Sequence, residues 1–324
     1  MSLKIAYLAK GRPDLKARIP QDVEGVILEA GPDGVYPPQA LAKVADVQAF
    51  VVSMEPVNEQ ILAAARQLKI VQRLGVGYET LDLKAAAQRG IPCCNVEGVN
   101  KEAVAEHGAA LIIALAKHLL ESDTLTRSGK WGESRLLTKT TFELNEKTMG
   151  IIGLGNTGSS LARRCKALGM RIVYNDIREI DPALVKELDA TFLPKAEIYR
   201  QADIISVNTD LNEQSRNMIN AETLSMMRPH ALFVCCARGG IVDEPALRDA
   251  LNAGRIAGAG IDVFETEPIP KHHPLFAAKN IILTSHVAGV TEETSQRTFD
   301  WAHENVRRVV LKGEKPRWVR NGVI

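Results

Sequence analysis

Three glycines follow a short apolar run near the middle of the chain. Gly153, Gly155 and Gly158 have the spacing G-x-G-x-x-G and come directly after residues 149–152. Glycines at this spacing allow a tight turn, a close approach of backbone to pyrophosphate, and close packing of a helix on a strand. A helix starting here points its unpaired N–H groups and the positive end of its dipole at that anion. The residues predicted to contact a dinucleotide in this turn are Gly153, Gly155, Asn156, Thr157 and Gly158.

An acidic residue follows the next β-prone run. Residues 171–174 lead into Asp176, where a carboxylate would accept hydrogen bonds from the adenosine ribose. A 2′-phosphate would meet the negative charge of Asp176, so NAD is favoured over NADP. Arg178 weakens that preference, because a basic side chain two residues later could reach a phosphate. The alternative is a glycine-rich turn that binds nothing, and the strand, helix and acid in sequence argue against it.

The first third of the chain alternates strand-like and helix-like segments, which predicts βα units and a parallel sheet. Strands are expected at 3–8, 26–28, 49–52 and 70–74, and helices at 41–44, 59–68 and 83–89. A second glycine stretch, Gly75-Val76-Gly77, follows the last of these strands and lacks a third glycine. It is either a plain βα turn or a loop whose N–H groups hold a small anion.

A long helix is expected over 102–119, with Asn100 as its N-cap. Its apolar residues surround most of its girth, so the helix is either buried or part of a subunit interface. His107 and His118 belong to it and are interpreted as structural.

The βα rhythm continues after Asp176. Strands are expected at 202–207, 231–236, 256–263 and 280–284, and N-caps at Asp181, Asp243 and Thr291. The last cap begins a helix running to about Leu311. This order predicts a nucleotide-binding domain over 100–290, inserted into a substrate domain built from 1–99 and 291–324.

Composition is that of an ordinary globular protein. The chain has 324 residues, 45% of them hydrophobic and 24% charged, which favours two domains. A net charge of +1 without a dense basic stretch argues against nucleic acid as the main partner. The N-terminus carries no signal-peptide pattern, and the longest uncharged apolar run, 108–116, is too short to span a membrane. A cytoplasmic protein without a membrane partner is expected.

The five cysteines include two vicinal pairs. The odd number and the absence of a secretory pattern fit reduced thiols, interpreted as small core residues, with redox activity of the pairs as the alternative. No His/Cys spacing suits a metal, so none is expected. The cysteines are Cys93, Cys94, Cys165, Cys235 and Cys236.

Three later segments carry a resemblance. They read CARGGIVDE at 236–244, GIDVFETEP at 260–268 and LTSHVAG at 283–289. Together with the glycine turn, and in this order from Gly75 to the final helix, they strongly resemble the D-isomer-specific 2-hydroxyacid dehydrogenases. The resemblance implies an α/β fold of two Rossmann-like domains with parallel sheets, one flavodoxin-like and one NAD-binding, with the active site in the cleft between them.

The resemblance also implies residue roles. His286 matches the catalytic acid/base, Glu267 the acid paired with it, and Arg238 the arginine that binds substrate. A histidine can give a proton to a carbonyl oxygen as hydride reaches its carbon, and a nearby carboxylate orients the ring. An arginine fork can bind a carboxylate in two contacts. Other matches are Val76 and Gly77 as a backbone clamp for the substrate carboxylate, and Asp262, the carbonyl of Cys236, and Gly289 at the cofactor.

The implied activity is NAD-dependent interconversion of a small D-2-hydroxy acid and its 2-keto acid. A glyoxylate or hydroxypyruvate reductase is favoured. A phosphoglycerate dehydrogenase is possible, although Ser53 and Met54 stand where such enzymes often carry arginine. A homodimer through the NAD-binding domain is expected. The alternative from another class is an NAD(H)-sensing corepressor of the same fold. Ser285 and Ala288 depart from the family pattern beside His286 and leave the substrate side chain open.

Overall fold

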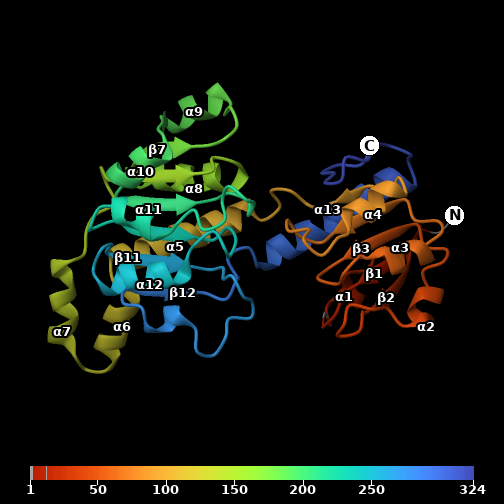
Figure 1. Ribbon diagram of the computed structural model, residues 1–324, viewed down its shortest axis with the longest axis horizontal. Helices are drawn as coiled ribbons and strands as arrows, with labels where there is room; N and C mark the ends of the chain where they lie inside the picture. The colour runs from red at the N-terminus through yellow and green to blue at the C-terminus, as the bar shows by residue number, and fades with distance from the viewer. Residues whose placement is uncertain (1–2, 12) are drawn as a thin grey trace. The chain divides into compact units, whose positions relative to one another are not determined.

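The computed structural model describes residues 3–11 and 13–324. These residues form two compact units (Figure 1). The terminal unit consists of the described part of Met1–Val99 together with Thr291–Ile324, and the central unit of Asn100–Val290.

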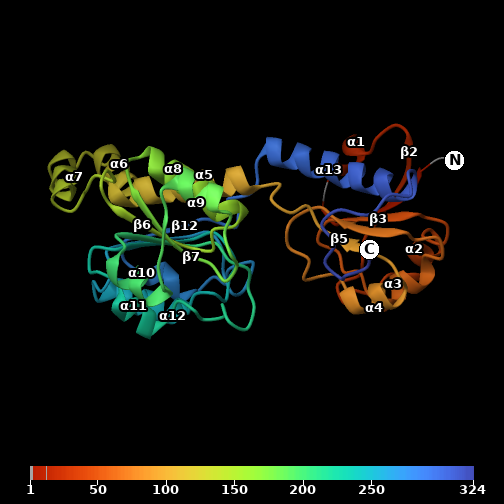
Figure 2. The same ribbon diagram turned by 90° about the horizontal axis from the view of Figure 1, so that it is seen from above.

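The terminal unit is built on a five-stranded parallel sheet in the order β2-β1-β3-β4-β5. This is the flavodoxin-like order. Both faces are covered: Figure 2 shows α13 on one and α3 and α4 on the other, which explains why β1, β3 and β4 are almost wholly buried. The strands are β1 Leu3–Leu8, β2 Val23–Leu28, β3 Ala49–Val52, β4 Ile70–Arg73 and β5 Cys93–Cys94, and the helices are α1 Leu15–Arg18, α2 Pro38–Ala42, α3 Glu59–Ala64, α4 Leu83–Gln88 and α13 Glu292–Val310.

Helices α2 and α3 in this unit differ most from the prediction. The helix expected at 41–44 is α2, which ends two residues earlier, at Ala42, and starts earlier because Pro38 supplies the fixed φ of a first helical position. Helix α3 ends at Ala64 rather than at residue 68. The cap predicted for α13 is confirmed, since the Thr291 side chain accepts the N–H of Thr294.

The central unit is built on a seven-stranded parallel sheet in the order β12-β11-β10-β9-β6-β7-β8. The prediction of two Rossmann-like α/β folds with parallel sheets is thereby confirmed. Figure 2 shows α5 and α8 on one face of this sheet and α10, α11 and α12 on the other. The strands are β6 Thr148–Ile152, β7 Arg171–Asn175, β8 Thr191–Phe192, β9 Ile204–Val207, β10 Leu232–Cys235, β11 Gly258–Ile261 and β12 Ile281–Leu283. The helices are α5 Lys101–Ala116, α6 Leu119–Arg127, α7 Trp131–Leu136, α8 Asn156–Ala167, α9 Pro182–Leu188, α10 Lys195–Gln201, α11 Ala221–Met226 and α12 Glu244–Asn252, with short 3₁₀ turns η1 Leu137–Lys139 and η2 Pro274–Ala277.

The order of the central sheet reverses at β6. The chain runs outward from β6 to β7 and β8, then returns to place β9 on the other side of β6. In open α/β sheets, ligands bind beyond the carboxyl ends of the strands at such a reversal. The glycine turn of the predicted dinucleotide site leaves the carboxyl end of β6.

The long helix predicted over 102–119 is present for most of its length but is interrupted near its end. Helix α5 ends at Ala116, and His118 adopts a left-handed conformation with φ 49° before α6 begins, bent by 59° from α5. Asn100 is the N-cap of α5 as predicted, but its side chain makes no capping hydrogen bond. The sequence left open whether this largely apolar helix is buried or lies in a subunit interface. Most of α5 is buried within the central unit.

Within residues 3–11 and 13–324, no single helix is long and apolar enough to cross a membrane. The bent pair α5 and α6 meets that criterion only when the two are taken together, by length and composition alone.

Candidate active site

The turn after β6 needs glycine at two positions for steric reasons. Gly153 has φ 91°, and a Cβ on it would lie 2.6 Å from the carbonyl oxygen of Asn208, which follows β9. A Cβ on Gly158 would lie 2.0 Å from the carbonyl oxygen of Gly153. The predicted close packing of helix on strand is therefore present, and the turn lies where β6 and β9 diverge.

The start of α8 has the form that an anion requires. Gly155 is its N-cap and makes no side-chain capping bond, and Asn156 and Thr157 are its first residues. The N–H groups of a first helical turn have no partner within the helix. They and the helix dipole can therefore receive a pyrophosphate, and these residues fit a dinucleotide cofactor.

Asp176 lies at the end of β7 beside this turn, with its side chain 5% exposed. Its Oδ2 accepts the N–H of Leu154 at 2.8 Å, and its Oδ1 accepts the N–H of Arg178 at 2.9 Å. The Arg178 guanidinium also contacts Oδ1 and extends over the glycine turn, because a Cβ on Gly155 would meet its Nη2 at 3.0 Å. Asp176 thus supports the turn itself, and its contact with a ribose stays a prediction.

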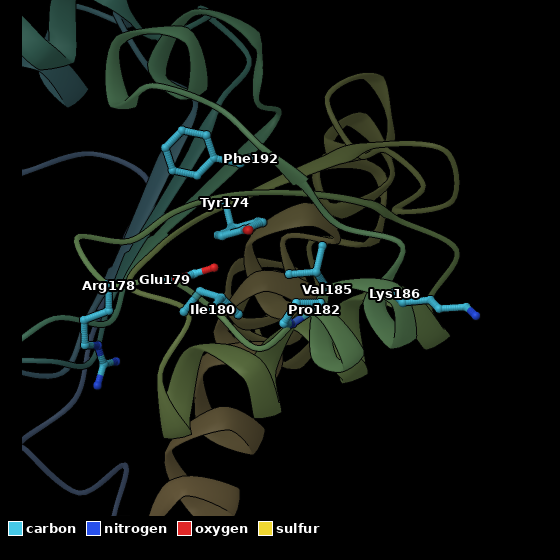
Figure 3. A pocket seen from close by; sticks show the side chains of 8 residues that line it. All are labelled: Tyr174, Arg178, Glu179, Ile180, Pro182, Val185, Lys186 and Phe192. Atoms are coloured by element: carbon cyan, nitrogen blue, oxygen red, sulfur yellow. The ribbon is translucent and has the colours of Figure 1, made fainter.

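A surface cavity of about 520 Å³ adjoins this region (Figure 3). In Figure 3, Arg178 and Lys186 lie at opposite ends of the lining, and Tyr174 and Val185 lie between them. Its lining comes from β7, β8, α9 and the segment before α9, and includes none of the predicted catalytic residues.

The three predicted catalytic residues follow three neighbouring parallel strands. Arg238 comes after β10, Glu267 after β11 and His286 after β12, and these strands pair side by side. The first two loops are in backbone contact, since a Cβ on Gly239 would lie 1.8 Å from the carbonyl oxygen of Phe264. The loops therefore leave the same edge of the sheet next to one another.

His286 and Glu267 form the pair that the sequence predicted. Nδ1 of His286 lies 2.7 Å from Oε2 of Glu267, and because a carboxylate only accepts, Nδ1 donates. The other oxygen, Oε1, accepts the N–H of Phe264 at 2.9 Å. Nε2 is then the ring nitrogen left to exchange a proton, on a side chain that is 48% exposed.

The backbone of His286 is strained. Its φ of 54° is left-handed, a conformation uncommon outside glycine and asparagine. Its N–H donates to the carbonyl oxygen of Asp262 at 2.8 Å, which ties the loop to β11. Strain of this kind persists only where the surrounding contacts impose it.

Asp262 supplies most of those contacts. Its carboxylate accepts the Thr284 hydroxyl at 2.6 Å and the N–H groups of Val287 and Ala288, each at 3.0 Å. The side chain is fully buried. In this structure Asp262 therefore holds the His286 loop, and the predicted contact with the nicotinamide would require the loop to shift.

The remaining predicted residues of the central unit lie at the same edge. Arg238 donates from Nη1 to the carbonyl oxygen of Ala237 at 2.8 Å. Cys236 directly follows β10, so its carbonyl belongs to this edge. A Cβ on Gly289 would lie 2.5 Å from Nδ2 of Asn100, so close packing against that side chain explains the glycine.

All five cysteines are free thiols. Burial raises the pKa of Cys93, Cys94 and Cys165 to about 12 and that of Cys235 to about 11. Burial also raises the pKa of Cys236 well above its ordinary value. Thiols with such a high pKa are almost entirely protonated at neutral pH and are poor nucleophiles, which supports their interpretation as core residues over redox activity. Among the described residues, no cluster of His, Cys, Asp or Glu could hold a metal ion.

The second glycine stretch lies in the terminal unit after β4. Asn95, which is buried, donates from Nδ2 to the carbonyl oxygen of Val76 at 2.7 Å, and the N–H of Val96 donates to the carbonyl oxygen of Gly75. Hydrogen bonds to the carbonyl oxygens of Gly75 and Val76 therefore fix the loop. The carboxylate clamp at Val76 and Gly77 stays a prediction.

Two residues near the pair were not singled out in the sequence. Glu244 and His273 are both buried and lie 2.8 Å apart, Oε2 to Nε2. Glu244 reads as an ordinary first-turn acid after Asp243, and His273 as part of a surface His-His-Pro. No local signal links positions so far apart in the sequence.

Comparison with known proteins gives a consistent result. The family model "D-isomer specific 2-hydroxyacid dehydrogenase, NAD binding domain" matches residues 109–288. A glyoxylate reductase of Korarchaeum cryptofilum is 38% identical over 269 residues, covering 82% of this chain and 80% of that protein. The structure resembles D-mandelate dehydrogenase of Rhodotorula graminis with a TM-score of 0.89 and 26% identity, covering 100% and 99% of the two chains. It also resembles the NADPH-dependent glyoxylate/hydroxypyruvate reductase of Sinorhizobium meliloti, solved with NADP and malonate, with a TM-score of 0.82 and 28% identity over 100% and 98%.

Proposed function

Because the chain belongs to the D-isomer-specific 2-hydroxyacid dehydrogenase family, whose members are NAD(P)-dependent oxidoreductases, we propose that it reduces glyoxylate or hydroxypyruvate to the corresponding 2-hydroxy acid. The observation that carries the proposal is the 2.7 Å contact between His286 Nδ1 and Glu267 Oε2 at the carboxyl edge of the central sheet. This pair orients an exposed imidazole so that Nε2 can transfer a proton.

The proposed roles follow from the chemistry of the side chains. A bound nicotinamide cofactor supplies the hydride in reduction. His286 gives the proton from Nε2 to the carbonyl oxygen, and Glu267 keeps Nδ1 protonated and fixes the ring. The guanidinium of Arg238 binds the substrate carboxylate and polarises the carbonyl, since it stays charged at every relevant pH. The N–H groups of Val76 and Gly77 in the terminal unit are proposed to bind a carboxylate.

The small keto acids are favoured by two features. Relatives that cover most of the chain are named glyoxylate reductase. At the end of β3, Ser53 is buried and Met54 is 69% exposed, so these two positions offer no cation for a phosphorylated substrate. The corepressor alternative is not favoured by relatives named as reductases.

The substitution His286→Gln tests the proposal. Loss of a general acid lowers the rate by ~10²–10⁴-fold, so NADH-dependent reduction of the best 2-keto acid should fall by that factor. The control is NADH affinity, measured by fluorescence titration, which should stay within a fewfold of the wild type. Undiminished turnover of the best substrate would refute the role of His286.

NAD is the proposed cofactor, with NADPH used less well. The support is Asp176, whose carboxylate lies beside the glycine turn and would repel a 2′-phosphate. The relative from Sinorhizobium meliloti is named as NADPH-dependent, so the preference has to be measured with both cofactors.

A homodimer through the central unit is proposed from its helical arm, defined as α6 and α7. Neither helix contains a buried residue, which is unusual for helices with several large apolar side chains. The exposed residues are Leu119, Leu120, Trp131 and Leu136, each at least half exposed. A second copy of the chain would cover them. A wild-type monomer in light scattering at micromolar concentration would contradict the dimer.

The cytoplasmic location expected from the sequence stays a prediction.

A further inference from the structure

We infer that Glu244 and His273 are positioning residues that set the catalytic pair by holding the turn on which Glu267 lies. The inference rests on the proposed function, in which Glu267 acts on His286. It concerns a buried hydrogen-bonded network that the proposed mechanism does not itself use.

One carboxylate joins three segments of the central unit. Glu244, the first residue of α12, accepts the N–H of Glu265 with Oε1 at 2.9 Å and contacts Nε2 of His273 with Oε2 at 2.8 Å. Both side chains are buried, Glu244 at 7% and His273 at 9% exposed. A buried carboxylate with both oxygens engaged cannot move without leaving a donor unpaired.

The ring of His273 is itself fixed. Its Nδ1 accepts the N–H of Leu275 at 3.4 Å, so Nε2 carries the proton and donates to Glu244. Phe264 and Phe276 each pack edge-on against the ring, with centroids 5.9 Å away. One hydrogen bond and two aromatic contacts therefore fix the orientation of the ring that donates to Glu244.

The held segment is short. Residues 264–267 connect the Glu244 contact at Glu265 to the catalytic acid at Glu267, whose Oε1 accepts the N–H of Phe264. Releasing Glu265 therefore frees the turn that aims Oε2 at His286. A misplacement of about 1 Å at a catalytic group can cost ~10²-fold in rate.

Two substitutions break the network in different ways. In Glu244→Gln, one of the two carboxylate oxygens becomes an NH2 group, so either the Glu265 N–H or the His273 Nε2–H faces a donor instead of its acceptor. His273→Phe keeps the aromatic packing and removes both the donor to Glu244 and the weaker acceptor for the Leu275 N–H. His273→Gln returns an amide donor and should restore much of the lost rate. The matched control is His230→Phe, which breaks a 2.8 Å contact between His230 and Asp203 elsewhere in the same unit.

A double-mutant cycle provides the decisive kinetic test. We expect His273→Phe to lower kcat by ~10-fold with NADH affinity unchanged, as loss of a partner behind a functional group typically does. In the Glu267→Gln background the same substitution should cost less than about twofold, because the residue through which it acts is already disabled. Equal losses in the two backgrounds would overturn the inference, since a general structural effect is additive.

A spectroscopic measurement separates this inference from the proposed function. In protein labelled with ¹⁵N-histidine, the ring-nitrogen resonances of His286, assigned through His286→Gln, should shift in Glu244→Gln and His273→Phe and stay fixed in His230→Phe. Unshifted resonances would refute the positioning role. If the wild type reduces no 2-keto acid, the proposed function fails, and the resonances still decide whether Glu244 and His273 set the His286–Glu267 pair.

Discussion

The substitution Gly239→Ala should uncouple the loops that carry the catalytic residues. The added Cβ would lie 1.8 Å from the carbonyl oxygen of Phe264, 2.1 Å from its carbonyl carbon and 2.6 Å from the nitrogen of Glu265. These are backbone atoms and cannot rotate away. Restoring ordinary contact at about 3.4 Å requires a movement of about 1.6 Å between the two loops. That movement separates Arg238 from Glu267 by more than a catalytic geometry tolerates.

The expected loss follows from that distance. A misplacement of ~1 Å costs about 10²-fold, so kcat/KM should fall at least ~100-fold, which corresponds to about 2.7 kcal/mol of transition-state stabilisation. Overpacking should also lower the free energy of unfolding by ~1–3 kcal/mol. The value of kcat/KM is measured by NADH oxidation at 340 nm with the best 2-keto acid, at a temperature below the unfolding midpoint of the variant. The free energy of unfolding is measured by chemical denaturation.

Gly108→Ala is the matched control. It lies inside α5 in the same unit, and its Cβ would meet only Leu161 side-chain atoms at 3.6 Å, an ordinary contact. Replacing glycine by alanine in a helix stabilises by up to ~1 kcal/mol, so this variant should be as active as the wild type and slightly more stable. A folded Gly239→Ala variant whose kcat/KM stays within threefold of wild type would refute the reasoning.

Three further predictions use other contacts. Asp176→Asn keeps an oxygen for the Leu154 N–H and removes the negative charge. The ratio of kcat/KM with NADPH to kcat/KM with NADH should therefore rise at least ~10-fold. An unchanged ratio would remove the basis of the NAD preference. Burial lowers the pKa of His303 from its ordinary value of 6.5, and its neutral ring bonds Tyr7 at 2.7 Å. The unfolded chain therefore binds the proton more readily, so this contribution to the free energy of unfolding is present above about pH 6.5 and is lost as the pH falls below it. Chemical denaturation at pH 8 and pH 5 should show a smaller loss of the free energy of unfolding in His303→Gln than in the wild type. Ellman's reagent should label the four buried thiols, all except the half-buried Cys236, slowly in the native protein and all five on unfolding; fast native labelling of more than one thiol would contradict that burial.

The βα elements were predictable because their signals are local. Period-2 and apolar runs located most strands of both sheets, and Asp181, Asp243 and Thr291 were identified as caps by residue type alone. The glycine turn was predictable because only glycine fits at Gly153 and Gly158. Such features are determined within about ten residues of sequence.

The break after α5 was not predictable, because no local signal marks it. The left-handed residue there is His118, and no glycine or asparagine marks it. Asn100 occupies the predicted N-cap position without a side-chain capping bond, because residue type indicates a capacity to cap and the fold decides whether it is used.

The candidate site was predictable only in part. Arg238, Glu267 and His286 were found through a family resemblance, and their place on adjacent strands follows from the strand order, which no single segment encodes. The burial of Asp262 and the pairing of Glu244 with His273 depend on contacts between loops of different strands. Local patterns do not carry that information.

The left-handed backbone at His286 has a consequence for evolution under selection for stability. Glycine or asparagine would adopt φ 54° with less strain, so their introduction should raise the melting temperature while removing the proton donor. Stability and activity are therefore opposed at this one position. A library selected only for heat resistance should enrich glycine or asparagine here, and one selected for turnover should restore histidine. The position would report directly which of the two pressures acted on a population of variants.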